Sequence, residues 1–388
     1  MSTWQTGRDA GLARLAEEGF QVRHLNNHLV IEHIPYRDAV GQIRYGKLAS
    51  PITWVGNEHV DPPADHVVWF QGDAPCGLDG QPLDLINTEQ HRELFPGFPV
   101  DFMFSKKPAA GYPNHYAKMA AYIGMLLGPA QAVDPTVTPN TFAKVPEIED
   151  WSPFRYRDSA SARAGISELN ARLRRQRIGI VGLGGTGSYI LDLVAKTEVG
   201  EIHLIDGDEF INHNAFRAPG AATVDQVSAR PLKVDYFASL YDPFRTGVIA
   251  HPLFLNMANT PELLGDLDFV FLAADHSDEI TASANWLRTN RLPFIDVGIG
   301  ISLTSQGLNG SVRTALFTAE TPLGIVVPCG RAVDDYSANI QVAEVNALNA
   351  ALAVLRWKRL FGIYLDNQSE YLSSYSLSMN SIGMPDLP

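Results

Sequence analysis

The sequence predicts an α/β protein with a doubly wound, mainly parallel sheet in its second part and a smaller α+β domain before it. An apolar, β-rich run at residues 178–181 enters a glycine-rich turn, and a helical segment and a second apolar strand at 201–205 follow. Further apolar strands at 269–273 and 293–297 alternate with helical segments. This alternation is typical of a parallel sheet, which binds ligands at the carboxyl ends of its strands.

The turn after the first of these strands carries four glycines, Gly182, Gly184, Gly185 and Gly187. A side chain there would block the close approach of the backbone to a phosphate, and the free amides at the start of the next helix favour an anion. Asp206 ends the second strand about 20 residues on, where a carboxylate can accept hydrogen bonds from ribose hydroxyls. We therefore expect a Rossmann-like nucleotide site. The alternative is a tight turn that only packs the helix against the sheet.

The composition is that of a globular chain of 388 residues, with 45% hydrophobic and 19% charged residues, which is enough for two domains. The formal net charge of −13 argues against a general nucleic-acid surface. No apolar run reaches the roughly 18 residues of a membrane span, and the N-terminus has no signal pattern. Cys76 and Cys329 lie far apart and in no CxxC pair, which supports neither a disulfide framework nor a cysteine-built zinc site. The cytosol is the default compartment.

Three segments are expected along the chain. Residues 1–145 combine short β-rich runs with two helical segments and form the α+β domain, and the proline-rich stretch 129–146 connects it to the second domain. Residues 146–372 hold the alternating strands and helices. The last helix is expected at 339–359, with asparagines that bond loop backbones near the nucleotide. The tail, 373–388, is expected to be disordered.

The residues after the second strand narrow the range of reactions that the site could catalyse. Asp206 and Asp208 form an Asp-x-Asp, and Asn214 and Arg217 follow as Asn-x-x-Arg. Together with the glycine-rich turn, this run resembles the family of ubiquitin-activating enzymes and their bacterial relatives, the ThiF/MoeB adenylyltransferases. The resemblance covers roughly residues 155–360. It implies a ThiF-type adenylation domain that uses ATP and Mg²⁺.

The resemblance also implies a role for each residue. Asp206 would bind the ribose, and Asn214 and Arg217 would hold phosphates. Lys233 would neutralise the leaving pyrophosphate, and Asp275, which ends a strand, would hold magnesium. Attack of a carboxylate on the α-phosphate spreads negative charge over the phosphate oxygens, so cations are needed around them. A simple dehydrogenase has no use for such a cluster.

Each of these side chains also has a structural interpretation. Asp208 could be only a turn acid, and Lys233 could be an ordinary exposed helix lysine. Asp278 could take the place of Asp275. Arg230 stands where the family pattern Gly-x-Pro-Lys has its glycine, which makes the register of the lysine less secure. An alanine also follows the signature arginine, where the family has glutamine.

Two further features of the family concern residues outside this signature. An arginine from a second subunit reaches into the family's site, so a homodimer is expected, with Arg163 as our candidate and Arg157 as the alternative. Cys329 lies between a proline and a glycine with Arg331 close by, which is compatible with an exposed thiolate that forms a thioester. The other interpretation is a small buried cysteine. Cys76 is expected to be structural.

The first hypothesis is ATP-dependent adenylation of the C-terminal glycine of a ubiquitin-like protein. Transfer to Cys329 and then to a conjugating-enzyme-like acceptor would follow. The first domain would recruit the ubiquitin-like protein or the next enzyme, or help dimerisation, and the combination resembles ThiF-type proteins of bacterial ubiquitin-like conjugation operons. Alternatives with the same chemistry are activation of a sulfur-carrier protein or of a tRNA-linked carboxylate. A nicotinamide oxidoreductase and an inactive nucleotide-binding scaffold are the alternatives from other classes.

Overall fold

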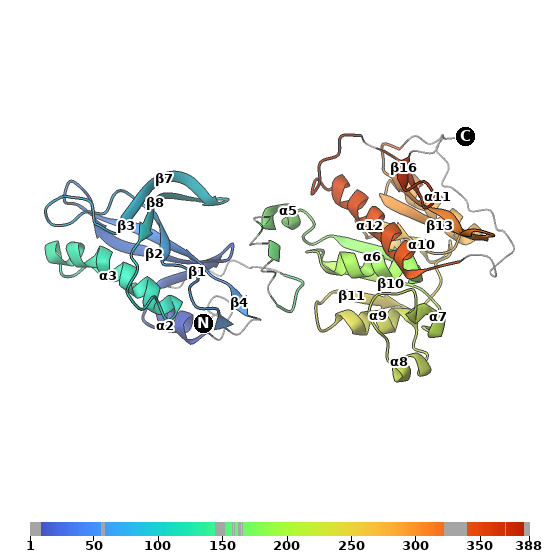
Figure 1. Ribbon diagram of the computed structural model, residues 1–388, viewed down its shortest axis with the longest axis horizontal. Helices are drawn as coiled ribbons and strands as arrows, with labels where there is room; N and C mark the ends of the chain where they lie inside the picture. The colour runs from blue at the N-terminus through green and yellow to red at the C-terminus, as the bar shows by residue number, and fades with distance from the viewer. Residues whose placement is uncertain are drawn as a thin grey trace. The chain divides into compact units, whose positions relative to one another are not determined.

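The computed structural model of the chain describes residues 9–55, 59–143, 152–156, 158, 160, 161, 164, 166–321, 340–368 and 370–383. Contacts divide the chain into two compact units (Figure 1). The first comprises Met1–Trp151 and Tyr156–Ser167, and the second comprises Ser152–Arg155 and Glu168–Pro388. Each unit has a sheet and a hydrophobic core of its own.

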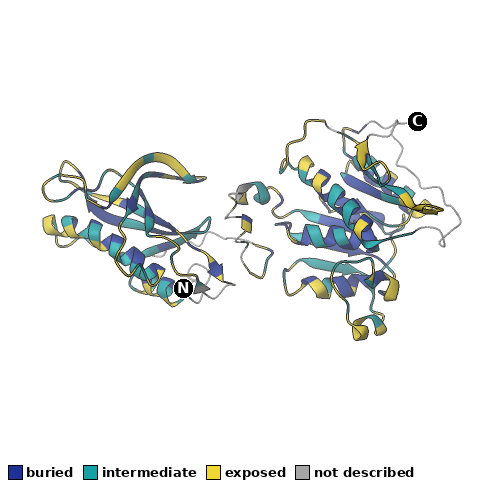
Figure 2. Cartoon of the chain, viewed as in Figure 1, coloured by how far each residue is buried: buried dark blue, intermediate teal, exposed yellow. Residues whose placement is uncertain are grey.

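The first unit is rich in β-structure. Its strands are β1 (Gln21–Leu25), β2 (His28–Arg37), β3 (Ile43–Pro51), β4 (Trp54–Val55), β5 (His59–Val60), β6 (Val67–Gln71), β7 (Ile86–Phe95) and β8 (Phe98–Ser105). Six of them form one antiparallel sheet in the order β1-β2-β3-β6-β8-β7, and β4 pairs with β5. The edge strand β7 exposes most of its residues, as Figure 2 shows.

Two helices, α2 (Ala10–Glu17) and α3 (His115–Val133), share the main core of this unit with the sheet. The Asp9 carboxylate starts α2 by accepting the amide of Leu12 at 3.0 Å, and the Asn114 side chain starts α3 by accepting the amide of Ala117 at 2.8 Å. Tyr122 of α3 is fully buried in the core. The prediction of a small α+β domain before the nucleotide fold is confirmed.

The second unit contains an eight-stranded sheet. Its strands are β9 (Arg177–Val181), β10 (Glu201–Ile205), β11 (Val248–His251), β12 (Phe269–Leu272), β13 (Phe294–Thr304), β14 (Gly307–Phe317), β15 (Leu372–Ser376) and β16 (Ser381–Gly383). The order is β11-β10-β9-β12-β13-β14-β15-β16; the first five strands are parallel and the last three are antiparallel additions. The predicted doubly wound, mainly parallel sheet is confirmed.

Helices cover both faces of this sheet. On one face the core contains residues of α6 (Gly185–Ala195), α9 (Lys233–Tyr241) and α12 (Ala343–Leu360), and on the other it contains residues of α10 (Thr260–Leu264) and α11 (Asp278–Thr289). The parallel strands are therefore buried on both sides, which explains their continuous apolar sequences. The short helices are α5 (Ser167–Ala171), α7 (Asn212–Ala215) and α8 (Val224–Ser228). Within the described part of the chain, every helix is too short or too polar to cross a membrane.

The C-terminal strands correct one prediction. β15 pairs with β14 and β16 pairs with β15, so disorder is the wrong expectation for residues 373–383; residues 384–388 lie outside the described part. Ser373 is buried and accepts a hydrogen bond from Arg356 of α12 at 2.7 Å. The extra strands also cover the edge that β14 would otherwise leave unpaired.

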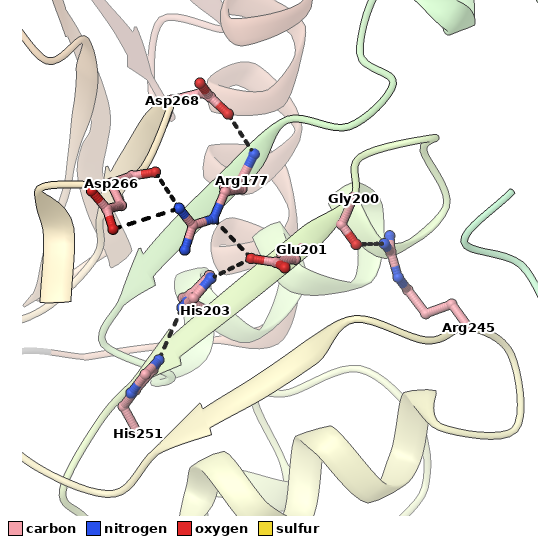
Figure 3. Close-up of polar contacts among 8 residues, drawn as sticks. All are labelled: Arg177, Gly200, Glu201, His203, Arg245, His251, Asp266 and Asp268. Atoms are coloured by element: carbon pink, nitrogen blue, oxygen red, sulfur yellow. Dashed lines mark hydrogen bonds and ion pairs between the residues drawn. The ribbon is translucent and has the colours of Figure 1, made fainter. Parts of the chain in front are cut away.

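A polar network crosses the strands β9, β10 and β11 (Figure 3). Arg177 begins β9, and its Nε lies 2.8 Å from a carboxylate oxygen of Glu201, which begins β10. The same oxygen lies 3.1 Å from Nε2 of His203, and Nδ1 of His203 lies 3.0 Å from Nε2 of His251. Because the network begins at the amino ends of the strands, away from the predicted ligand edge, we interpret it as structural.

Candidate nucleotide-binding site

The glycine-rich turn between β9 and α6 needs its glycines for two different reasons. Gly182 has φ +86°, and a Cβ on it would lie 2.6 Å from the backbone nitrogen of Ala274. A Cβ on Gly187 would lie 1.8 Å from the carbonyl oxygen of Gly182. Gly184, at the N-cap of α6, has open space around its Cβ position. The first two glycines therefore permit close packing, and Gly184 leaves room for a ligand before the helix.

Asp206 is buried at the carboxyl end of β10 and is fixed by two hydrogen bonds. Its Oδ2 accepts the amide of Leu183 at 2.6 Å, and its Oδ1 accepts the amide of Asp208 at 2.8 Å. The first bond ties the carboxylate to the glycine-rich turn. The carboxylate is thereby held beside the place where the sequence predicts ribose and phosphate.

Lys233 is buried at the start of α9. Its ammonium lies 2.7 Å from Oδ2 of Asp208 and 3.5 Å from Oδ2 of Asp206. The interpretation of Lys233 as an ordinary exposed helix lysine is therefore wrong. Asp208 is more than a turn acid, because it is the nearer ion-pair partner of this lysine.

The backbone conformation of Arg230 explains how Lys233 can keep the position of the family's lysine although the glycine of the family pattern is absent. Its φ is +47°, so a non-glycine residue adopts the left-handed conformation at this position. An ion pair of 2.6 Å with Glu209 holds the Arg230 side chain, and the backbone amide of Lys233 donates to the carbonyl of Asp208 at 2.8 Å. The segment before α9 is thus fixed to the segment after β10.

Arg217 and Asp275 come from separate loops and interact electrostatically. Arg217 follows α7 and is half-buried, and its Nε has no hydrogen-bond partner among the described residues. Burial lowers the pKa of Arg217, whereas the negative charge of Asp275 acts in the opposite direction. Asp275 is exposed in the loop after β12. A desolvated guanidinium nitrogen without a partner is costly, so this site is suited to an anionic ligand.

Asn214 is the remaining residue of the predicted phosphate set. It is buried in α7, and its Oδ1 accepts the backbone amide of Ile211 at 2.9 Å. The side chain thereby fixes the turn that leads to Arg217, whose amide donates to the carbonyl of Asn214 at 3.1 Å. Asn214 therefore shapes the backbone that carries Arg217.

Two families match the chain, one for each unit. Residues 10–159 match a domain of unknown function, DUF6791, and residues 157–361, more than half of the chain, match the ThiF family. The chain belongs to the ThiF family. The match spans the glycine-rich turn, the Asp-x-Asp and Asn-x-x-Arg elements, Lys233 and Asp275.

Relatives of this ThiF-family chain align with parts of it. Ubiquitin-like modifier-activating enzyme 5 of Culex quinquefasciatus is 29% identical over 159 residues, which are 37% of this chain and 39% of the relative. Adenylyltransferase and sulfurtransferase UBA4 of Eremothecium gossypii is 24% identical over 244 residues, 59% of this chain and 51% of the relative. The crystal structure of E. coli MccB with ATP is 18% identical and covers 59% of this chain and 71% of that chain, with a TM-score of 0.48. The chain thus spans about two fifths to one half of the length of these curated relatives.

The last long helix of the ThiF-family unit contacts the glycine-rich turn through asparagine. Oδ1 of Asn346 accepts the hydroxyl of Thr186 at 2.9 Å, and a Cβ on Gly185 would lie 2.3 Å from the Asn346 side chain. Nδ2 of Asn349 donates to the carbonyl of Gly298 at 3.2 Å. Asn346 therefore contacts a side chain of the turn, and Asn349 bonds a backbone carbonyl of strand β13 rather than of a loop, so the expected bonds to loop backbones are not what these two asparagines make.

Some predicted residues lie outside the described part of the chain, namely Arg157, Arg163, Cys329 and Asn339. Cys76 is described and buried, its thiol lies 3.3 Å from the carbonyl of Ala74, and burial raises its pKa. A buried thiol of raised pKa is a poor nucleophile, in agreement with a structural role. Across the described ranges, no three His, Cys, Asp or Glu side chains gather as a metal site, so Asp275 stands there as a single carboxylate.

A buried ion pair near this edge was missed in the sequence analysis. Asp296 of β13 is almost fully buried, and its Oδ2 lies 2.7 Å from Nη2 of Arg313 in β14. Nε2 of His276, the residue after Asp275, lies 3.3 Å from the same nitrogen. The available signal was an acidic residue within an apolar strand and a basic residue in the next strand, since both would have to find partners if buried.

Proposed function

We propose that this chain uses ATP and Mg²⁺ to adenylate the C-terminal glycine of a ubiquitin-like protein. The observation that carries the proposal is the arrangement of two cationic side chains beside the glycine-rich turn. Lys233 is buried between two carboxylates, and Arg217 keeps a desolvated nitrogen without a partner in the described chain. Both lie at the carboxyl ends of the strands, where sheets of this type bind nucleotides.

The chemistry of adenylation explains why such cations are needed. A carboxylate oxygen of the substrate attacks the α-phosphorus of ATP, the bond from that phosphorus to the bridging oxygen breaks, and pyrophosphate leaves. Negative charge grows on the phosphate oxygens, and Arg217 and Lys233 would stabilise it. Asp206 would accept the ribose hydroxyls, because its position beside Leu183 is fixed.

Asp275 is the residue that would hold Mg²⁺. This ion is usually bound by one or two carboxylates together with substrate phosphates, so a single exposed carboxylate is a sufficient protein contribution. When bound, Mg²⁺ supplies positive charge to the triphosphate. The electrostatic interaction between Asp275 and Arg217 supports a shared location at the phosphates.

The class of substrate is supported by the relatives. Two of them are described as ubiquitin-like modifier-activating enzymes, and a third as an adenylyltransferase and sulfurtransferase. A tRNA threonylcarbamoyladenosine dehydratase is another relative, so a sulfur carrier and a tRNA-linked carboxylate stay as alternatives within the same chemistry. We favour the ubiquitin-like protein, because a net charge of −13 disfavours a tRNA partner.

The later steps of the proposal rest on residues known here from sequence alone. Cys329 would receive the activated glycine as a thioester and pass it to a conjugating-enzyme-like acceptor. Arg163, or Arg157 in its place, would act across a homodimer. A strictly monomeric mass in light scattering would contradict the arginine from a second subunit.

Equilibrium titration with ATP and with NADH tests the nucleotide assignment. We expect wild-type protein to bind ATP in the presence of Mg²⁺ and to show no comparable affinity for NADH, because hydride transfer makes no use of Arg217 and Lys233. Asp275→Ala should weaken binding of ATP with Mg²⁺ by about tenfold or more, the loss of a charged contact. Asp278→Ala, at the exposed start of α11, is the matched control and should bind like wild type.

Two results would count against this assignment. Tighter binding of NADH than of ATP would favour the oxidoreductase. Equal effects of the two aspartate substitutions would remove the metal role from Asp275.

A further inference from the structure

A second polar cluster lies beside the proposed ATP site. Its residues come from the loop after β12 and from the next two strands of the sheet, β13 and β14. The cluster consists of Asp296, which is buried, and of Arg313 and His276, which are partly exposed. Arg313 donates to Asp296 through Nη2 at 2.7 Å. Nε2 of His276 is 3.3 Å from Nη2 of Arg313 and 3.8 Å from Oδ1 of Asp296. The shorter distance makes His276 a hydrogen-bond acceptor from Arg313.

The register of the sheet places this cluster at the same height along the strands as Asp275, the proposed metal ligand. Asp296 pairs with Leu272, the last residue of β12, so Gly298 extends beyond the end of that strand. Arg313 pairs with Gly298, and a Cβ on Gly298 would lie 2.9 Å from Nη2 of Arg313. The guanidinium therefore lies across the backbone of β13, beside the loop that contains Asp275 and His276. A side chain at this position would have to displace the guanidinium.

The cluster presents hydrogen-bond donors while its charge is balanced. Nη1 of Arg313 is buried and has no partner among the residues that the structure describes. An arginine can only donate, so the Nε2 atom of His276 is the acceptor in its contact with Arg313. Asp296 balances the charge of Arg313. An ion pair whose charges balance and which keeps an unpartnered N–H suits a neutral acceptor such as a peptide carbonyl better than another phosphate.

The order of the strands gives the direction in which the substrate extends. Ribose would lie at Asp206 after β10, and the phosphates at the glycine-rich turn after β9. The acyl group, bonded to the α-phosphate, would then lie above β12 and the rest of its chain above β13. Neighbouring strands are about 4.8 Å apart and an extended residue spans about 3.4 Å. The residue before the reacting one therefore falls near Arg313.

We propose that Nη1 of Arg313, positioned by Asp296, donates a hydrogen bond to the peptide carbonyl that precedes the C-terminal glycine of the acyl substrate. The contact rests on the proposed function and specifies its substrate. It selects a peptide tail over a free small acid, because a free amino acid has no such carbonyl. Asp296 is a positioning residue in this arrangement.

Stable analogues of the adenylate test this contact without turnover. The probes are glycyl-sulfamoyladenosine and glycylglycyl-sulfamoyladenosine, which differ by one peptide unit, titrated calorimetrically into the full chain. Wild-type protein should bind the dipeptide analogue about tenfold more tightly, the gain from one hydrogen bond to a charged donor. In Arg313→Ala the two analogues should bind equally, and the affinity for the glycyl analogue should be unchanged.

Arg313→Lys is a second test variant, which keeps the test possible if Arg313→Ala does not fold. Lysine keeps a positive charge opposite Asp296 but lacks a second nitrogen, so it should also bind the two analogues equally. Arg288→Ala, which changes an arginine of α11, is the matched control and should keep the tenfold difference. A tenfold difference retained in Arg313→Lys would overturn the inference, as would equal binding of both analogues by wild type. Failure of wild type to bind either analogue or ATP would overturn the proposed function itself.

Discussion

Lys233 is held by two unequal carboxylates. Asp206 is buried and is already bound to backbone amides, whereas the nearer partner, Asp208, is 56% exposed at its side chain. An ion pair with a solvent-exposed carboxylate contributes little free energy, so the ammonium can leave Asp208 for a phosphate oxygen at small cost. Burial in turn would strengthen its interaction with a triphosphate, because water screens it less.

Substitution of the two cysteines should have opposite effects on a thioester adduct. Cys329→Ala should keep ATP–pyrophosphate exchange and lose any adduct with a ubiquitin-like protein that a reducing agent releases, because a thioester needs the thiol. Cys76→Ala is the control and should keep the adduct, since Cys76 is buried and its thiol has a raised pKa. A non-reducing gel checks both. An adduct that persists in Cys329→Ala would assign the nucleophile elsewhere.

The site residues that could be predicted from the sequence are those that lie close to one another along the chain. The glycine-rich turn, Asp206 and the Asn-x-x-Arg element follow one another at short spacing, so their pattern could be recognised without knowledge of the fold. Asp296 and Arg313 are 17 residues apart, and they meet only because β13 and β14 pair in one register. The sequence signals only that an acid in an apolar strand needs a partner; it does not specify the register that makes Arg313 this partner.

At the scale of elements, one buried arginine holds the connection between α6 and β10. Arg245 is fully buried, and its guanidinium donates to carbonyls of this connection at 2.6 to 3.4 Å. Burial lowers its pKa to about 10. The acceptors are the carbonyl oxygens of Ala195, Thr197, Val199 and Gly200. Four carbonyls of an irregular segment are thus satisfied by one side chain.

Arg245→Met should lower the free energy of unfolding of the second unit by about 3–5 kcal/mol, because it leaves these buried carbonyls without donors. Arg174→Met is the control. Arg174 is partly exposed and pairs with Glu198 at 2.7 Å, so its loss should cost about 1 kcal/mol or less. Urea unfolding measures both. A loss below 1 kcal/mol in Arg245→Met would contradict the structural role.

Strands could be predicted from the sequence where burial produces a clear pattern of apolar residues. The parallel strands are continuous apolar runs because helices cover both of their faces. β15 is rich in serine and has no such pattern; it is held by pairing with β14 and by Arg356, a residue of α12. These contacts are long-range, so the segment was mistaken for a disordered tail.

At the scale of the whole molecule, a buried histidine should make the first unit sensitive to acid. His115 is buried in α3 of the first unit, and burial, followed by the charge of Lys118, lowers its pKa to about 4. The ordinary value is about 6.5, so the unfolded chain takes up the proton at higher pH than the folded chain does. The stability of the first unit should therefore fall as pH falls from about 6.5 to about 4, by about 3 kcal/mol.

Hydrogen exchange of the α3 amides in the full chain measures this pH dependence. His115→Gln removes the titrating group and should flatten the dependence over the same range. Peptides from α6 in the second unit serve as the internal control and should not respond to the substitution. An unchanged pH dependence in His115→Gln would assign the acid sensitivity to other groups.

ATP–pyrophosphate exchange, measured with and without ubiquitin-like proteins that end in glycine, is the most direct test of adenylation by this chain. Adenylation is reversible, so labelled pyrophosphate should enter ATP only when the correct protein is present. We expect exchange that depends on the ubiquitin-like protein in wild type and in Asp278→Ala, and loss of exchange in Asp275→Ala. Exchange at the wild-type rate in Asp275→Ala, or exchange that is independent of the added protein, would contradict this expectation.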